Sequence, residues 1–178
     1  MPGNTGNEEE KEVLTLLHVA ALEGRTEVIP FLLSNGFDVN TSTNKGFTPL
    51  HSATIRNHHQ AARLLLENGA KPNVKNNLGG VPLLYAALDD HVETARELLK
   101  HGAIADVPDN TGATPLHIAA EKGATKVAKL LVANGADPHL KNEGGKTPLD
   151  VATAEVATIF RHHLARRKKL KLPPSANN

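Results

Sequence analysis

Residues 114–117 of the chain read Thr-Pro-Leu-His, and residues 48–51 read the same four residues. Midway between these copies, residues 81–84 read Val-Pro-Leu-Leu. Residues 15–18 and 147–150 carry further variants, so the phrase returns five times at a constant step of 33 residues. Five copies without an insertion or deletion between them define an internal repeat. In such an array each unit packs only against its neighbours, and the core grows along one axis.

The copy that begins at Thr114 shows which structure one unit forms. Thr114 is suited to cap a helix by accepting a hydrogen bond from a free amide, and Pro115 suits the first helical position. After Gly123 a second helix is expected, with one apolar face formed by Val127, Ala128, Leu131 and Val132. Both helices are short and marginal alone, so their stability has to come from stacking on the next copy.

The residues that end these helices recur in step along the chain. The first helices are expected to end at Gly24, Asn57, Asp90 and Gly123, and the second helices at Gly36, Gly69, Gly102 and Gly135. Gly, Asn and Asp are the residues that most readily adopt the positive φ common at helix ends. The remaining third of each repeat is rich in Asn, Asp and Gly, which is typical of tight turns.

This pattern resembles the ankyrin repeat, whose 33-residue period and Thr-Pro-Leu-His-x-Ala-Ala phrase it shares. The resemblance implies an all-α repeat solenoid of antiparallel helix pairs, with β-turn or hairpin loops that project nearly at right angles. We expect an ankyrin-repeat domain at residues 13–166, with repeats one to five starting near residues 15, 48, 81, 114 and 147. An acidic, disordered tail (residues 1–12) is expected before it, and a basic, disordered tail (residues 167–178) after it.

Three repeats depart from the pattern. Repeat one has Pro30 inside its second helix, which predicts a kink or a late helix start. Repeat three has Val81 in place of the capping Thr and Leu84 in place of His, so we expect it to be the softest internal repeat. Repeat five lacks the mid-repeat Gly, and its second helix is expected to start near Glu155.

Composition limits the classes of function. The formal net charge is +1, but six basic residues lie from Arg161 to Lys171, which leaves 14 basic against 19 acidic residues elsewhere, a net of −5. The chain has no cysteine, so disulfides and thiolate metal sites are excluded. No stretch approaches about 18 apolar residues, so no membrane span is expected. The N-terminus has no apolar run and is not expected to be a signal peptide. We expect a cytoplasmic protein, with a nuclear location as the alternative.

Ten histidines raise the question of a metal or catalytic site. Five of them recur at equivalent repeat positions and are expected to be architectural: His18, His51, His117, His58 and His91. The pairs His58–His59 and His162–His163 are not natural two-ligand sites, because helix neighbours point about 100° apart. No nucleophile elbow, phosphate-binding loop or carboxylate pair is present. We expect no enzyme activity, no cofactor and no metal.

Candidate partner-binding residues are those that differ between copies while the rest of the repeat agrees. By resemblance to the family, one set lies at the exposed loop tips and flanks the loop glycine: Asn44, Lys45, Phe47, Asn77, Leu78, Asn110, Thr111, Glu143 and Lys146. The other set precedes the mid-repeat break: Leu22, Glu23, Ile55, Arg56, Leu88, Asp89, Glu121 and Lys122, with Tyr85 one turn before Leu88. The apolar members gather in repeats one to three, which indicates an interaction patch. Alternatively, some of these side chains pack between adjacent first helices.

The sequence therefore predicts a non-enzymatic module that binds another protein in its concave groove, and we expect it to be a monomer. The alternative is a regulatory subunit or inhibitor that masks the active or targeting surface of an enzyme or transcription factor. An enzyme is a distant third. Nucleic-acid binding is not favoured, since the repeats carry no basic stripe.

The basic end of the chain has two interpretations. Arg166, Arg167, Lys168, Lys169 and Lys171 resemble a short nuclear-import signal. The alternative is a helix end whose cations complement the helix dipole.

Overall fold

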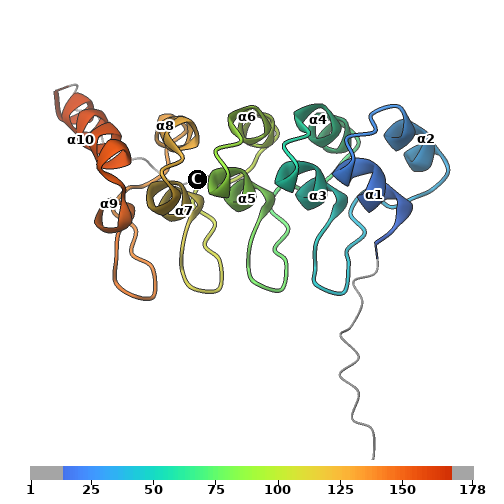
Figure 1. Cartoon of the computed structure of the whole chain (residues 1–178), viewed down its shortest axis with the longest axis horizontal. Helices are drawn as coiled ribbons and strands as arrows, with labels where there is room; N and C mark the ends of the chain where they lie inside the picture. The colour runs from blue at the N-terminus through green and yellow to red at the C-terminus, as the bar shows by residue number, and fades with distance from the viewer. Residues whose placement is uncertain (1–13, 170–178) are drawn as a thin grey trace, which may run out of the picture.

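The computed structural model describes residues 14–169, with side chains described for residues 14–166. Five pairs of helices stand side by side in one row (Figure 1). The first helices of the pairs are α1 (Leu16–Leu22), α3 (Pro49–Ile55), α5 (Pro82–Leu88), α7 (Pro115–Lys122) and α9 (Pro148–Val151). The second helices are α2 (Val28–Ser34), α4 (His59–Glu67), α6 (Val92–Lys100), α8 (Thr125–Ala133) and α10 (Ala154–Lys169).

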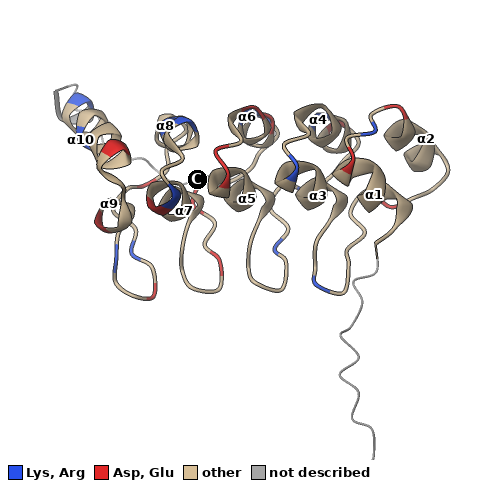
Figure 2. Cartoon of the chain, in the orientation of Figure 1, with Lys and Arg blue, Asp and Glu red and all other residues tan. Residues whose placement is uncertain are grey.

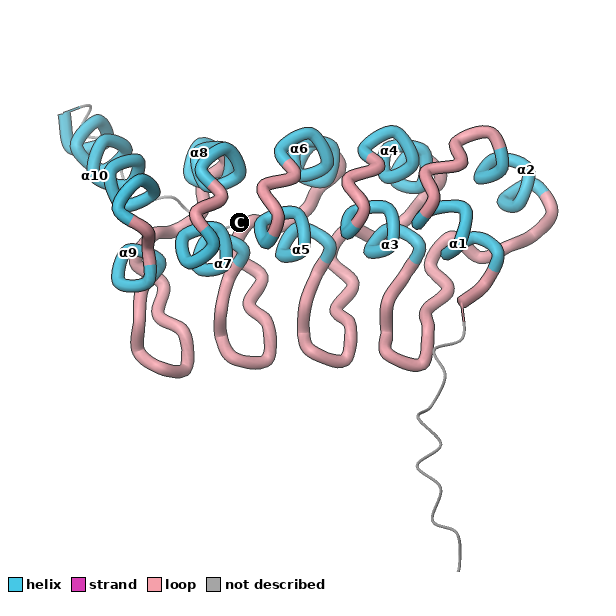
Figure 3. The backbone as a smooth tube through the Cα atoms, in the orientation of Figure 1, coloured by secondary structure: helices cyan, strands magenta, loops and turns pink. Residues whose placement is uncertain are grey.

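The helices form two rows, and the loops between successive pairs project from them to one side (Figure 3). Each first helix packs on the next first helix, from α1 through α9. No strand occurs in residues 14–169, so the described part of the chain is the all-α repeat solenoid that the sequence predicts. One boundary differs: α10 continues to Lys169, beyond the expected domain end at residue 166. The expected N-terminal tail and the end of the C-terminal tail lie outside the described residues.

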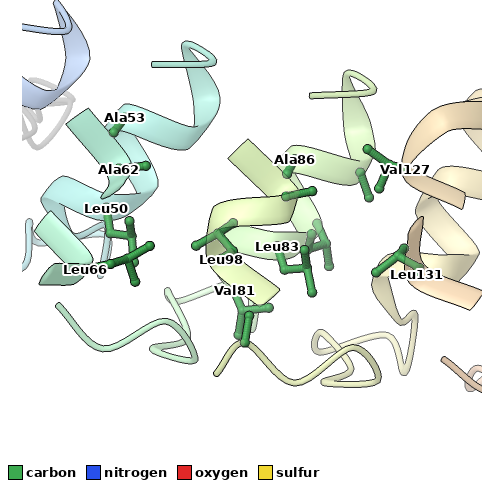
Figure 4. Packing of buried hydrophobic residues seen from close by; sticks show 14 of the residues in the cluster. Leu50, Ala53, Ala62, Leu66, Val81, Leu83, Ala86, Leu98, Val127 and Leu131 are labelled. Atoms are coloured by element: carbon green, nitrogen blue, oxygen red, sulfur yellow. The ribbon is translucent and has the colours of Figure 1, made fainter. Parts of the chain in front are cut away.

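The core is a continuous apolar layer that runs between the two rows of helices. Its leucines recur at equivalent positions of successive repeats, and Leu50, Leu65, Leu83, Leu98, Leu116 and Leu131 are all fully buried. Figure 4 shows Leu50, Leu83 and Leu131 within this layer. Ala53, Ala86 and Ala119 are also fully buried, and their small side chains let neighbouring helices approach closely.

The helix ends follow the predicted caps. Thr15, Thr48, Thr114 and Thr147 each accept a hydrogen bond from a backbone N–H in the first turn, whereas Val81 makes no side-chain cap. The predicted helix breaks have positive φ: 68° at Gly24, 56° at Asn57, 54° at Asp90 and 72° at Gly123. The left-handed breaks are therefore confirmed, including the two that are not glycine.

The departures in repeats one and five are also confirmed. Helix α2 begins at Val28, two positions later in the repeat than α4, α6 and α8, and therefore has seven residues rather than nine. Pro30 thus lies in its first turn, where a missing N–H breaks no helical hydrogen bond. In repeat five, α9 has only four residues, and α10 begins at Ala154, next to the predicted Glu155.

Candidate partner-binding surface

Histidines tie three of the first helices, α1, α3 and α7, to the base of the following loop. The Nε2 atoms of His18, His51 and His117 lie 2.9, 3.1 and 2.9 Å from the carbonyl oxygens of Phe47, Gly80 and Lys146. A carbonyl only accepts, so Nε2 must carry the hydrogen in each case. At His51 the Nδ1 atom then accepts from the N–H of Thr48, at 3.1 Å. Both ring nitrogens are used only while the ring is neutral, and burial lowers the pKa of His51 to about 4.

Two further histidines belong to the scaffold. His91 Nδ1 lies 3.0 Å from the carbonyl oxygen of Thr54 in the preceding repeat. The ring of His58 lies against Gly24, where an added Cβ would come within 2.6 Å of it. The architectural interpretation is therefore confirmed for His18, His51, His117 and His91 by their bonds to backbone, and for His58 by packing. Among the residues that the structure describes, no cluster of three His, Cys, Asp or Glu side chains is placed to hold a metal ion.

Phe47 does not lie at a loop tip, contrary to the expectation from the sequence. The N–H of Thr43 donates to the carbonyl of Phe47 and the N–H of Gly46 donates to Thr43, so the tip is at Asn44 and Lys45. Phe47 is half-buried at the base of the loop. Its ring centroid lies 5.5 Å from that of His51 and 5.6 Å from that of Tyr85. This aromatic cluster joins repeats two and three.

An apolar hollow of about 230 Å³ opens beside this cluster, between α1 and α3. It is lined by Leu14, Leu22, Phe47, Ser52 and Ile55. The structure thus brings together three of the predicted partner-binding residues, Leu22, Phe47 and Ile55. Ser52 was missed, although it holds the same repeat position as Tyr85, and comparing that position across repeats is the signal that finds it. Leu14 precedes the first repeat and carried no such signal.

The loop tips are linked to one another, which changes the role of two candidate residues. The Nδ2 of Asn77 donates to the carbonyl of Asn44 at 3.0 Å, and the Nδ2 of Asn110 donates to the carbonyl of Asn77 at 3.0 Å. The side-chain amides of Asn77 and Asn110 therefore bond to the preceding loop and hold the loops in register. Five of the other candidate side chains near these tips are exposed: Lys45, Leu78, Thr111, Glu143 and Lys146.

Charged residues at the ends of the first helices alternate in sign. Glu23, Arg56 and Asp89 are the C-caps of α1, α3 and α5, and Lys122 is the last residue of α7. We call these four exposed residues the charge row (Figure 2). Glu155, at the start of α10, is exposed at the fifth equivalent position. Leu22, Ile55, Leu88 and Glu121 immediately precede the row and form a second line beside it.

The stability of single helices does not account for the two acids in the charge row. A carboxylate at a helix C-terminus faces the negative end of the dipole, a cost of about 0.3–1 kcal/mol. Attraction between row members on neighbouring helices, whose axes lie roughly 8–10 Å apart, amounts to about 0.4 kcal/mol in water before salt screening. Glu23 also pairs with Arg25, whereas the described residues provide no such ion pair for Asp89. Asp89 in particular is not explained by folding.

The remaining candidate residues lie at the C-terminal end. Arg166 is exposed on α10, and Arg167, Lys168 and Lys169 continue the same helix. Lys171 lies outside the described residues, so the nuclear-import hypothesis stays a prediction. Among residues 14–169, no helix combines the length and the apolar character needed to cross a membrane.

Comparison with known proteins completes this description. The family model described as "Ankyrin repeats (3 copies)" matches residues 3–76 and 72–142, which together make up most of the chain. The search of curated proteins found no match. Ankyrin repeats are generally protein–protein interaction modules. With helix pairs, capped first helices and projecting loops repeated every 33 residues, this chain belongs to the ankyrin-repeat family.

Proposed function

We propose that the chain is a non-enzymatic module that holds a partner protein against the exposed face of its first helices, centred on repeats one to three. The observation that carries this proposal is the apolar hollow lined by Leu22, Phe47 and Ile55. A concave apolar site with polar residues around it is the usual form of a binding site.

The surroundings of the hollow support binding by a rigid surface. The base of the loop is held by His18 on one side and by the contact of Phe47 with His51 on the other. A surface that is already ordered loses little conformational entropy when a partner binds. In repeat three and the loop before it, Leu88 and Leu78 are also exposed, by 37% and 69%.

The arrangement of charge also suits a protein partner. Arg56 and Glu23 are exposed directly after Ile55 and Leu22, so the apolar residues have a charged border on one side. Protein interfaces commonly have an apolar centre and a polar rim, and Arg is frequent among the residues that dominate binding energy. We therefore place Leu22, Ile55 and Leu88 at the centre of the contact, and Arg56 at its edge.

Ile55→Glu tests this proposal without disturbing the fold. Repeat four has Glu121 at the equivalent position, which shows that the repeat accepts glutamate there. The matched control is Ile104→Glu, because Ile104 is 53% exposed and its equivalents are Lys71 and Asp137. Phe47→Ala is a poorer probe, since a half-buried aromatic residue affects folding as well as binding.

The measurement is affinity capture from cells by wild type, Ile55→Glu and Ile104→Glu, followed by calorimetry with the purified partner. We expect Ile55→Glu to lose the partner that wild type and Ile104→Glu retain. All three should melt at similar temperatures by circular dichroism. Equal capture by Ile55→Glu and wild type would remove the hollow from the binding surface.

A further inference from the structure

The charge row is complementary to itself when it is read in the opposite direction. From repeat one to repeat four its signs are negative, positive, negative and positive, and from repeat four to repeat one they are reversed (Figure 2). A second copy turned end for end therefore presents an opposite charge to every member of the row. We propose that the charge row joins two copies of this chain in an antiparallel, two-fold symmetric dimer.

The register of this dimer follows from the repeat. Because the spacing between units is the same in both copies, all four contacts form together once one of them is aligned. Glu23 then faces Lys122 of the second copy, and Arg56 faces its Asp89, each contact occurring twice. Pairing all five positions, with Glu155 included, would place like charges opposite one another, so that register is excluded.

Two registers pair four positions with opposite charges throughout, and apolar residues select between them. With repeats one to four paired, the two-fold axis passes between α3 and α5, and Ile55 faces Leu88 of the second copy. With repeats two to five paired, Leu88 would instead face Glu121 next to the axis. An interface is most apolar at its centre and polar at its rim, which favours the first register. Leu88 is 37% exposed and available for such a contact.

The acids of the row support an intermolecular role. Asp89 lies at the unfavourable end of α5, and no ion pair within the described residues compensates for this position. An opposite charge from a second copy would do so. This inference goes beyond the proposed function and does not depend on it, since it rests on the charges of the row. The dimer would cover Ile55, which also lines the hollow, so a second copy and a partner protein would compete for this part of the surface. It replaces the expectation of a monomer.

Two single charge reversals test the dimer. In Arg56→Glu the new glutamate faces Asp89 of the second copy, and in Asp89→Arg the new arginine faces Arg56, so each variant places two like-charged pairs in its own dimer. We expect each to weaken self-association by roughly tenfold or more in sedimentation at low salt. Mixing the two variants makes every contact of the proposed register opposite in sign again, whereas the register of repeats two to five would keep two like-charged contacts in the same mixture. The mixture should therefore form a heterodimer about as tight as the wild-type dimer.

The control is Lys129→Glu, which makes the same charge change at an exposed position of α8, away from the row. It should associate like wild type, and melting curves should show that all variants are folded. If the wild type stays monomeric at low salt, the proposal is wrong, and the charge row would then be a site for a different protein. The proposal also fails if the mixture associates no more tightly than either variant alone, or if both variants dimerise like wild type.

Discussion

Repeats two and three form the same helix with different chemistry at its start. In repeat two, Thr48 caps α3 and His51 donates from Nε2 to the carbonyl of Gly80. In repeat three the equivalent residues are Val81 and Leu84, which are 0% and 8% exposed. Yet α3 and α5 both have seven residues and begin at the proline that follows the cap position. Apolar packing can therefore replace a polar cap without changing the geometry of the repeat.

The replacement of His by Leu84 removes a hydrogen bond to the next loop. The carbonyl oxygen of Ala113 is equivalent to that of Gly80 and accepts a hydrogen bond from the N–H of Asp109. Leu84 has no polar hydrogen, so it cannot donate the hydrogen bond that His51 donates in repeat two. Each lost hydrogen bond is worth about 0.5–1.5 kcal/mol, and burial of a leucine contributes about 1.5–3 kcal/mol. The two effects are of similar size. Whether repeat three is the softest internal repeat, as its sequence indicates, thus depends on how well its apolar residues pack.

Equivalent core deletions in the two repeats give the largest expected effect. Leu65 in repeat two and Leu98 in repeat three are both fully buried. We expect Leu65→Ala and Leu98→Ala each to lower the free energy of unfolding by about 2–5 kcal/mol. If repeat three depends on packing, Leu98→Ala should cost at least as much as Leu65→Ala in chemical denaturation. A clearly smaller cost at Leu98 would contradict the comparison.

The pH dependence of stability separates the polar junction from the apolar one. The pKa of His51 is lowered to about 4 by burial, so the unfolded chain takes up a proton on this residue before the folded chain does. The neutral His51 side chain contributes fully to the free energy of unfolding above about pH 6.5. This contribution falls by up to about 3 kcal/mol as the pH is lowered toward 4. Denaturation curves across this window should show wild type losing stability steadily.

The matched variant carries the residues of repeat three in repeat two, as Thr48→Val with His51→Leu. Since it has no imidazole at this position, its stability should fall less over the same pH range. Identical slopes for wild type and the double variant would mean that His51 is not held neutral by the fold.

The residues at the helix breaks of repeats two and three, Asn57 and Asp90, accept hydrogen bonds from different groups of the next repeat. The Oδ1 of Asn57 accepts a hydrogen bond at 2.9 Å from the hydroxyl of Thr94, which is fully buried. The Oδ1 of Asp90 accepts from the N–H of Val127 at 2.8 Å, near the start of α8, which has no side-chain cap of its own. Both residues therefore bond to the next repeat as well as adopting a positive φ.

Asn57→Gly should for this reason destabilise the protein. Glycine relieves the positive φ but leaves the hydroxyl of Thr94 without its acceptor, a loss of about 1 kcal/mol after both effects. Adding Thr94→Val removes the unpaired hydroxyl, and thermal melts should show that this second change recovers part of the loss. If Asn57→Gly alone is neutral or stabilising, the contact with Thr94 contributes nothing.

The fold could be predicted from the sequence because each repeat signals its own ends. The caps at Thr48 and Thr114 and the breaks at Asn57 and Asp90 are local features, and a constant period places them in register. The exposure of the candidate residues was predicted less well, because exposure depends on contacts between repeats. Phe47 follows a loop glycine and was expected to be exposed, but its neighbours His51 and Tyr85 hold it half-buried.

The same limit applies to side chains that bond across repeats. Asn110 was expected at an open loop tip, but it donates to the carbonyl of Asn77, 33 residues earlier. A position that looks variable in one repeat can thus serve the next one. Such roles become visible only when equivalent residues of adjacent repeats are placed side by side.

The smallest expected effect concerns the junctions that precede and follow repeat three. The Nδ2 of Asn73 donates to the carbonyl of Gly102 at 3.0 Å, and its Oδ1 accepts from the N–H of Ile104 at 2.9 Å. Asp106 holds the equivalent position one repeat later and accepts from the N–H of Asp137, but a carboxylate has no hydrogen to donate. Burial, together with the charge of Asp137, raises the pKa of Asp106.

Asp106→Asn should therefore stabilise the protein, since the amide regains a donor and removes a charge that burial disfavours. We expect a gain of about 0.5–1.5 kcal/mol at neutral pH. Because a raised carboxyl pKa costs the folded state stability only while the group is ionised, the gain should shrink as acid protonates Asp106. Asn73→Asp makes the reverse change at the equivalent position and should destabilise by a similar amount. Denaturant titrations of both variants decide the matter: loss of stability in Asp106→Asn would show that the carboxylate at this junction is favourable.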